Sequence, residues 1–319
     1  MSYIEDFKNV IFGYSRDIKR YLSGDKEDYI YCEEKSLEHG IYDKNHKNRK
    51  RLCYALTYNV CEVTDKKNIV RELFIEELKD RETNSFQGIG GNLEMFTSLL
   101  LEIGDPSDKP LFERAKNANF DCACGYEPRI IEPMPLDEFS LYDCINALSD
   151  LGETELMLKF TNEFKNGELD YKALLKLRYI AEWCTKRESD KEFAAERLYE
   201  LYQKEPSIFD KNTAFNAVSD YIELLIEKGD ISKAEELFNS SKEILSGYKR
   251  NYYKLGAVII SKGADEPKKI WSDILPFIQT DLKNNMVAPI NKDHILTASR
   301  IAGDKKTEKQ LVKYFHLRK

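Results

Sequence analysis

Two cysteines, Cys122 and Cys124, stand one residue apart and are the first candidates for chemistry in this sequence. Thiolates at this spacing can bind a metal ion, but a tetrahedral site needs two further ligands close by. Cys144 is the nearest other cysteine along the chain, and no histidine lies near the pair in sequence. Because cysteine also serves as a small buried apolar residue, the pair predicts packing and no metal or redox site.

A glycine-rich run at residues 87–92 (QGIGGN) precedes an apolar helix that we expect to begin near Leu93. Backbone amides at such a turn can bind a phosphate group. No strand is expected before the run, and no Lys-Ser or Lys-Thr pair follows it, so neither the dinucleotide fingerprint nor the P-loop is present. The run therefore predicts a turn between helices.

The titratable residues do not form a recognisable catalytic pattern. The four histidines, His39, His46, His294 and His316, are widely spread, and neither an HExxH pair nor a GxSxG turn occurs. Acidic residues are so abundant that pairs of them arise by chance, whereas acid–base catalysis requires a paired constellation with shifted pKa values. We therefore predict that the protein is not an enzyme, with no catalytic residues, no metal ligands and no cofactor.

The overall charge is acidic, with 49 Lys and Arg against 56 Asp and Glu, a net charge of −7 and a pI of about 5.4. A general nucleic-acid binder needs a positive field to displace counterions from phosphates, so this balance argues against nucleic acid. One basic run occurs at residues 44–51 (KNHKNRKR). It predicts a solvated loop or helix start, and the alternative is a patch for an acidic partner, RNA or a nucleotide.

The first 20 residues carry scattered charges and no uninterrupted apolar core, which argues against a signal peptide. The apolar stretches are too short to span a bilayer, so no membrane partner is expected. An odd number of cysteines, seven, without an export signal indicates reduced thiols. We expect a cytoplasmic protein, and the Lys-, Ile-, Asn- and Glu-rich composition suggests a bacterial source.

The spacing of the apolar residues predicts that helices position all of these side chains. A hydrophobic fraction of 42% excludes wholesale disorder, and 319 residues exceed what one compact core usually holds. Apolar residues recur every three or four positions, as in the set Tyr221, Leu224 and Leu225 and the set Ala234, Leu237 and Phe238. Each set lies along one stripe of a helix, which predicts an all-α fold.

Short breaks recur between these helices and several share a glycine followed by an acidic residue. Glycine supplies the left-handed residue that ends one helix, and the acidic residue caps the next. After Gly152 the breaks are separated by about 35 to 42 residues, the period of helical-hairpin solenoids. The predicted turns are Thr64–Asp65, Gly104–Asp105, Gly152–Glu153, Arg187–Asp190, Gly229–Asp230, Gly263–Asp265 and Gly303–Asp304.

Residues 216–244 (NAVSDYIELLIEKGDISKAEELFNSSKEI) resemble a tetratricopeptide repeat. Gly229 stands at the turn between the two helices, Ala234 at the close helix contact and Phe238 four residues further on. The next repeat keeps Gly256 but has Lys268 in place of the small residue, and elsewhere the likeness is one of period only. The resemblance implies a tetratricopeptide- or HEAT-like α-solenoid of about seven antiparallel helical hairpins.

Residues 117–135 (NANFDCACGYEPRIIEPMP) interrupt the helical pattern. Pro128, Pro133 and Pro135 prevent a continuous helix there, so we expect an irregular insertion. The predicted organisation is an irregular N-terminal helical part over residues 1–135 and a helical-hairpin array over residues 136–319, which together form one continuous solenoid.

The resemblance implies a binding groove, because the first helix of each tetratricopeptide hairpin lines the concave face. Carried over to this sequence, the inward positions are Tyr142, Asn146, Asn216, Ser219, Glu223, Arg250, Tyr253, Asp293 and Thr297. A second candidate surface lies in the insertion, because irregular segments on rigid scaffolds often carry binding. Its residues are Asn119, Asp121, Tyr126 and Arg129.

These observations predict a protein-binding scaffold whose partner is another protein or a peptide. The specific hypothesis is a bacterial immunity or antitoxin-like protein that neutralises a toxin by occlusion, since an acidic scaffold would speed its encounter with a basic toxin domain. Two alternatives stay open. One is a peptide-sensing regulator or adaptor of the tetratricopeptide type, and the other is a HEAT-like nucleic-acid enzyme, which would need a basic concave face.

Overall fold

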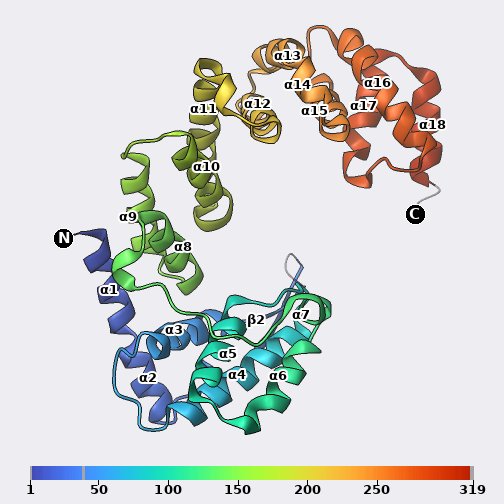
Figure 1. The fold of residues 1–319 in the computed structure, drawn as a ribbon. Helices are drawn as coiled ribbons and strands as arrows, with labels where there is room; N and C mark the ends of the chain where they lie inside the picture. Colours follow the sequence, from blue (N-terminus) through green and yellow to red (C-terminus); the bar gives the residue numbers. More distant parts are fainter. Residues whose placement is uncertain (1, 38–39, 317–319) are drawn as a thin grey trace. The chain divides into compact units, whose positions relative to one another are not determined.

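A computed structural model describes residues 2–37 and 40–316 (Figure 1). The described chain is helical almost throughout, so the predicted all-α class is confirmed. It forms two compact units, Met1–Gly167 and Glu168–Lys319. The predicted boundary after residue 135 falls inside the first unit, because helix α8 (Leu141–Leu151), which follows that point, packs against helices of the first fifty-odd residues.

The first unit builds its core from helices that are far apart in the sequence. Its other elements are α1 (Tyr3–Gly13), α2 (Ser15–Leu22), β1 (Glu33–Ser36), β2 (Gly40–Asp43), α3 (His46–Thr57), α4 (Lys66–Thr83), α5 (Gly91–Ile103), η1 (Pro106–Asp108), α6 (Lys109–Lys116), α7 (Phe120–Gly125), η2 (Leu136–Glu138) and α9 (Thr154–Lys165). Leu52 of α3, Phe74 of α4 and Phe96 of α5 are buried together with the other apolar side chains of these helices. Helix α3 contacts α4, α5 and α8, and is thus the centre of the unit.

A short antiparallel hairpin, β1–β2, is the feature of the first unit that the helical pattern does not predict. Its register places Glu33 opposite Asp43 and Ser36 opposite Gly40. Strand β2 packs on α4, and the Ser85 amide donates a hydrogen bond to the Ile41 carbonyl at 2.8 Å. Strand β1 is largely exposed, and its sequence, EEKS, contains no apolar residue. The alternation of apolar and polar residues that indicates a strand is therefore missing there.

The insertion is irregular, as its prolines predict, except for the six-residue helix α7. Residues 126–135 have no regular secondary structure and are anchored by side chains. Lys116 donates to the Tyr126 carbonyl at 2.8 Å, and the Ile131 amide donates to the Ser98 hydroxyl at 2.9 Å. These bonds hold the segment against helices α5 and α6.

The second unit is a succession of helical hairpins (Figure 1). Its elements are α10 (Tyr171–Tyr179), the π-helical segment η3 (Ile180–Thr185), α11 (Glu188–Lys204), η4 (Pro206–Ile208), α12 (Lys211–Glu227), α13 (Ile231–Ser240), α14 (Lys242–Ser246), α15 (Lys249–Lys262), α16 (Pro267–Lys283), η5 (Pro289–Asn291), α17 (Lys292–Ala302) and α18 (Lys305–His316). The pairs α10/α11, α12/α13, α15/α16 and α17/α18 each pack together.

The glycine turns between these helices have the predicted geometry. Gly229, Gly263 and Gly303 adopt left-handed φ angles of 79°, 107° and 78°, a conformation that glycine reaches without steric cost. After two of them the acidic residue caps the next helix. Asp230 accepts a hydrogen bond from the Lys233 amide at 3.3 Å, and Asp304 accepts one from the Thr307 amide at 3.0 Å.

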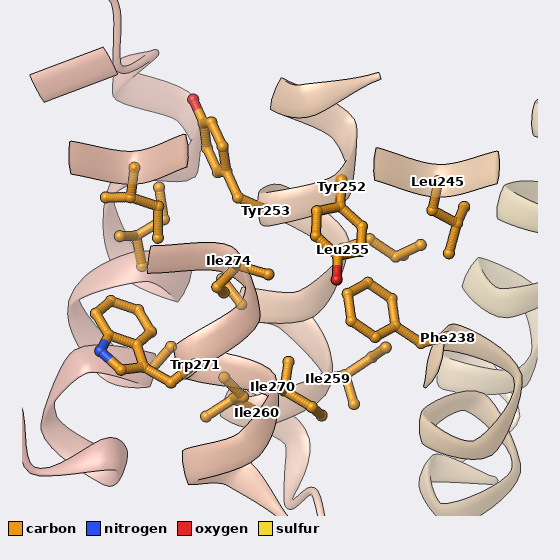
Figure 2. Packing of buried hydrophobic residues seen from close by; sticks show 14 of the residues in the cluster. Phe238, Leu245, Tyr252, Tyr253, Leu255, Ile259, Ile260, Ile270, Trp271 and Ile274 are labelled. Carbon is orange, nitrogen blue, oxygen red and sulfur yellow. The ribbon is translucent and has the colours of Figure 1, made fainter. Parts of the chain in front are cut away.

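The core of the second unit is shown in Figure 2. The rings of Phe238 and Tyr252 stack with centroids 4.8 Å apart and planes 5° from parallel. A Cβ atom at Gly256 would lie only 2.9 Å from Ile274 and 3.0 Å from Phe238, so α15 can approach α16 this closely because residue 256 has no side chain. Ala234 is fully buried, as expected for the small residue at the close helix contact.

Two neighbouring buried tyrosines in this core have different environments (Figure 2). Both Tyr252 and Tyr253 are 0% exposed. The Tyr253 hydroxyl donates to Asp281 at 3.1 Å, whereas the Tyr252 hydroxyl has no hydrogen-bond partner among the described residues. A buried polar group without a partner has lost its hydration and gained nothing in exchange.

We therefore expect opposite effects from removing the two hydroxyls. Tyr252→Phe should raise the free energy of unfolding by about 0.5–1 kcal/mol, and Tyr253→Phe should lower it by about 1–2 kcal/mol because a bond to a carboxylate is lost. Urea unfolding followed by tryptophan fluorescence measures this, since both tryptophans, Trp183 and Trp271, lie in the second unit. Equal effects of the two substitutions would contradict the assignment of partners.

Candidate functional site

A pocket of about 220 Å³ opens on the second unit between η3, α11 and α12. Its floor is apolar, because Ala181, Ala194 and Leu224 are buried there. The remaining walls are mostly charged. The lining residues with charged side chains are Arg178, Glu182, Glu188, Lys191, Glu192, Asp220, Glu223 and Glu227.

The charge of this lining is strongly unbalanced. Six acidic side chains face two basic ones, a formal excess of four negative charges. Part of the negative charge is neutralised within the lining, because Lys191 lies 3.8 Å from Glu188 and Arg178 pairs with Asp220. Two lysines outside the lining contribute as well, since Lys228 lies 3.6 Å from Glu192 and Lys254 lies 3.5 Å from Glu223. Carboxylates crowded into one depression repel each other and favour any cation that enters.

Arg178 and Asp220 form the best-defined ion pair of the pocket. The Nε and Nη2 atoms of Arg178 lie 2.5 and 3.3 Å from the two carboxylate oxygens of Asp220. Burial raises the pKa of Asp220 above its usual value, even though the Arg178 charge acts in the opposite direction. The neighbouring acids Glu223 and Glu182 raise it further.

Glu227 carries the clearest sign of uncompensated charge. Burial raises its pKa, and so do the neighbouring charges of Glu188 and Glu223. Glu227 is also the last residue of α12, where the partial negative charge of the helix terminus disfavours an acidic side chain. A positive group that enters the pocket beside Glu188 and Glu227 would relieve this repulsion.

The π-helical segment η3 shapes the mouth of this pocket. After α10 the chain continues in a wider, π-helical turn. This turn ends at Lys186, whose φ of 52° is left-handed. Single π-helical turns are often found at functional sites. This turn brings Glu182 to the pocket and leaves the next residue, Trp183, 63% exposed, with Tyr179 47% exposed on the preceding turn.

Of the residues predicted to bind a partner, Glu223 is the one that lines this pocket. Asn216 and Ser219 lie along the same face of α12, and the Ser219 hydroxyl donates to the Asn216 carbonyl at 3.3 Å. Arg250 is exposed on α15 and pairs with Asp281 at 3.3 Å. Asp293 and Thr297 lie on α17, outside the residues that line the pocket.

Two predicted tyrosines have packing roles instead. Tyr253 is 0% exposed and Tyr126 is 2% exposed, with the Tyr126 and Thr97 hydroxyls 2.7 Å apart. Asn119 caps α7 by accepting from the Cys122 amide at 2.8 Å and donates to the carbonyls of Arg81 and Gly88. These side chains are therefore already engaged in packing and hydrogen bonds within the protein.

The other predicted residues lie in the first unit and do not join the pocket. Asp121 and Arg129 are exposed on the insertion, and Tyr142 and Asn146 are half-buried on α8, where the Asn146 amide donates to the Tyr142 carbonyl at 2.8 Å. Cys122 is buried and its thiol donates to the Gly88 carbonyl at 3.8 Å. Burial raises the pKa of that thiol, which suits a packed cysteine.

Sequence reasoning named Glu223 but missed Glu188, Asp220 and Glu227, because acidic residues are common throughout the chain. One signal was available. Asp220, Glu223 and Glu227 follow each other at spacings of three and four residues, which places all three on one face of a helix. Like charges in that arrangement destabilise a helix, so three of them on one face mark that face as a candidate binding surface for a cation.

Comparisons with known proteins assign no identity to this chain. No family model, curated protein or solved structure matches it. Within the described residues, no helix is both long enough and apolar enough to cross a membrane. The proposed function therefore depends on the pocket.

The raised pKa of Glu227 predicts a pH-dependent stability. The folded state holds this proton more tightly than the unfolded chain, so its protonation stabilises the fold, and that contribution is lost as pH rises above about 4.5, the ordinary value. Glu227→Gln should therefore raise the melting temperature at pH 7.5, by about 1–2 °C, and have little effect at pH 4. A difference that does not change with pH would contradict the repulsion described above.

Proposed function

We propose that this chain is a non-catalytic protein-binding scaffold of helical hairpins whose second unit receives a basic segment of a partner protein. The observation that carries the proposal is the acidic pocket of about 220 Å³, whose lining has six carboxylates and two basic side chains and includes Glu227, whose pKa the neighbouring carboxylates raise. A pocket of this size holds one or two side chains and no folded domain. Its chemistry therefore fits an arginine or lysine side chain projecting from a larger partner.

The apolar and aromatic surroundings support arginine in particular. A guanidinium group is planar, is more weakly hydrated than an ammonium group and pairs with two carboxylate oxygens at once. The buried alanines of the floor would pack on its methylene groups. Trp183, exposed beside Glu182, offers an aromatic face to a second cation. Exposed tryptophan is also typical of residues that dominate protein interfaces.

Within this class, the specific proposal is an immunity or antitoxin-like protein that neutralises a basic toxin domain by occlusion. The acidic pocket supports it, because complementary charge speeds association and selects against acidic partners. The same charge supports a protein over a nucleic acid as the partner, since the carboxylates would repel a phosphate backbone.

Binding of a cationic peptide tests the pocket directly. A fluorescent ten-residue arginine peptide should bind the wild-type chain, and Glu188→Gln/Glu227→Gln should weaken its affinity by about 10-fold, equivalent to about 1.4 kcal/mol. The matched control is Glu127→Gln/Glu132→Gln, which removes the same charge from exposed residues of the first unit. If both variants lose affinity equally, binding follows net charge and the pocket has no special role.

Occlusion of a toxin requires a natural partner. Affinity purification of the tagged chain from its native cytosol should yield one basic protein at a one-to-one ratio, and the Glu188→Gln/Glu227→Gln variant should not retain it. Adding the wild-type chain should then suppress that partner's toxic or nuclease activity. A stable partner that is retained equally by the variant, or that has no such activity, would contradict the proposal.

A further inference from the structure

A second cluster of charges lies inside the first unit, around the N-terminus of α3. Arg49 is 0% exposed, and its guanidinium lies 2.5 Å from Asp43 and 3.0 Å from Glu77. Asp43 ends the β1–β2 hairpin, and Glu77 is fully buried on α4. A buried charge needs partners, and the two carboxylates supply them, so Arg49 has a structural role.

The adjoining side chains of His46, Glu77 and Asp80 converge on one point. The Nδ1 atom of His46 lies 3.7 Å from Oε1 of Glu77 and 3.5 Å from Oδ2 of Asp80. Asn92 Nδ2 lies 3.4 Å from the same Nδ1 atom, and Arg81 donates to Oδ2 of Asp80, so an ion would share these atoms with Asn92 and Arg81. The His46, Glu77 and Asp80 atoms all lie within 4.8 Å of one another. Ligands of a tetrahedral ion with bonds of about 2.1 Å stand roughly 3.4 Å apart, so an ion can contact these three atoms after small shifts.

One of these atoms has no hydrogen-bond partner in the described structure. Oε1 of Glu77 is buried and receives no hydrogen bond, although its residue is completely shielded from solvent. The Arg81 Nε atom approaches it only to 3.6 Å. A desolvated carboxylate oxygen without a hydrogen bond is costly, and a cation between the three side chains would compensate it.

The other oxygen of Glu77 is held in place. It accepts hydrogen bonds from Nε and Nη2 of Arg49, at 3.2 and 3.0 Å, and from the Asn92 amide at 3.3 Å. Asn92 also bonds the His46 carbonyl at 3.3 Å. Such outer contacts orient ligands in metal sites, and here they direct Oε1 of Glu77 toward His46 and Asp80.

We propose that His46, Glu77 and Asp80 bind a divalent first-row transition metal ion through Nδ1, Oε1 and Oδ2. One imidazole nitrogen and two carboxylate oxygens suit this class of ion better than Mg²⁺ or Ca²⁺, which prefer oxygen ligands alone. Three protein ligands leave further positions for water. The His46 side chain is 33% exposed, which gives the ion a path from solvent.

The local charge balance is compatible with a cation. Three carboxylates, those of Asp43, Glu77 and Asp80, face the guanidinium groups of Arg49 and Arg81, so one negative charge remains. In the competing arrangement no metal is bound, and the same side chains form only a network of ion pairs. The two arrangements differ in whether an ion occupies the space between His46, Glu77 and Asp80.

Cobalt(II) is the probe that separates these arrangements, because its visible spectrum reports its ligands. After treatment with a chelator, the full-length chain should bind one Co²⁺ with nitrogen and oxygen ligation and no thiolate-to-cobalt charge-transfer band. That band matters because the chain has seven cysteines and thiolates bind metals readily. His46→Gln should weaken binding at least about 10-fold while the far-UV circular dichroism is unchanged.

His294→Gln is the matched control, since His294 is also half-buried and bonds Ser261 at 3.0 Å in the second unit; it should bind Co²⁺ like the wild type. Asp80→Asn provides a second ligand variant that spares the Arg49–Glu77 pair. If folded wild-type protein does not bind Co²⁺, or if binding shows thiolate ligation or survives His46→Gln, the metal site is overturned and the cluster is an ion-pair network. Neither result bears on the acidic pocket of the second unit.

Discussion

The first unit depends on a guanidinium group that is entirely removed from water. Arg49 lies on the central helix α3, and its two carboxylate partners come from a strand and from another helix, α4. A charge buried in this way must keep all its partners, because losing one leaves an uncompensated ion. The contacts of Arg49 with Asp43 and Glu77 thus determine where the β1–β2 hairpin ends against α3 and how α3 and α4 face each other. They therefore also determine where His46 of α3 meets Asp80 of α4.

The second unit uses charge in the opposite way. Its core is apolar, with aromatic stacking and a glycine contact between helices. Apart from the buried Asp190 and Glu235, its charged side chains among the described residues lie nearer the surface. There the acidic side chains of α11 and α12 outnumber the basic side chains that line the same pocket. Charge in the first unit specifies packing, whereas charge in the second unit is left available to a ligand.

Local patterns in the sequence were sufficient to predict the helices and their turns. The left-handed glycines at 229, 263 and 303 and the caps at Asp230 and Asp304 follow from residue types a few positions apart. The candidate sites could not be predicted in the same way. Glu188 and Glu227 are 39 positions apart and meet through the packing of α11 on α12. His46 likewise meets Glu77 and Asp80, more than 30 positions further along the chain, through the packing of α3 on α4.

The succession of hairpins in the second unit also has a kinetic consequence. Each helix there packs mainly on elements close to it in the chain, such as α15 on α16 and α17 on α18. Chains dominated by such local contacts close short loops and fold quickly. Each hairpin can therefore form soon after it leaves the ribosome and serve as the template for the next, so the apolar core around Tyr252 is completed only when α16 and α17 have been made.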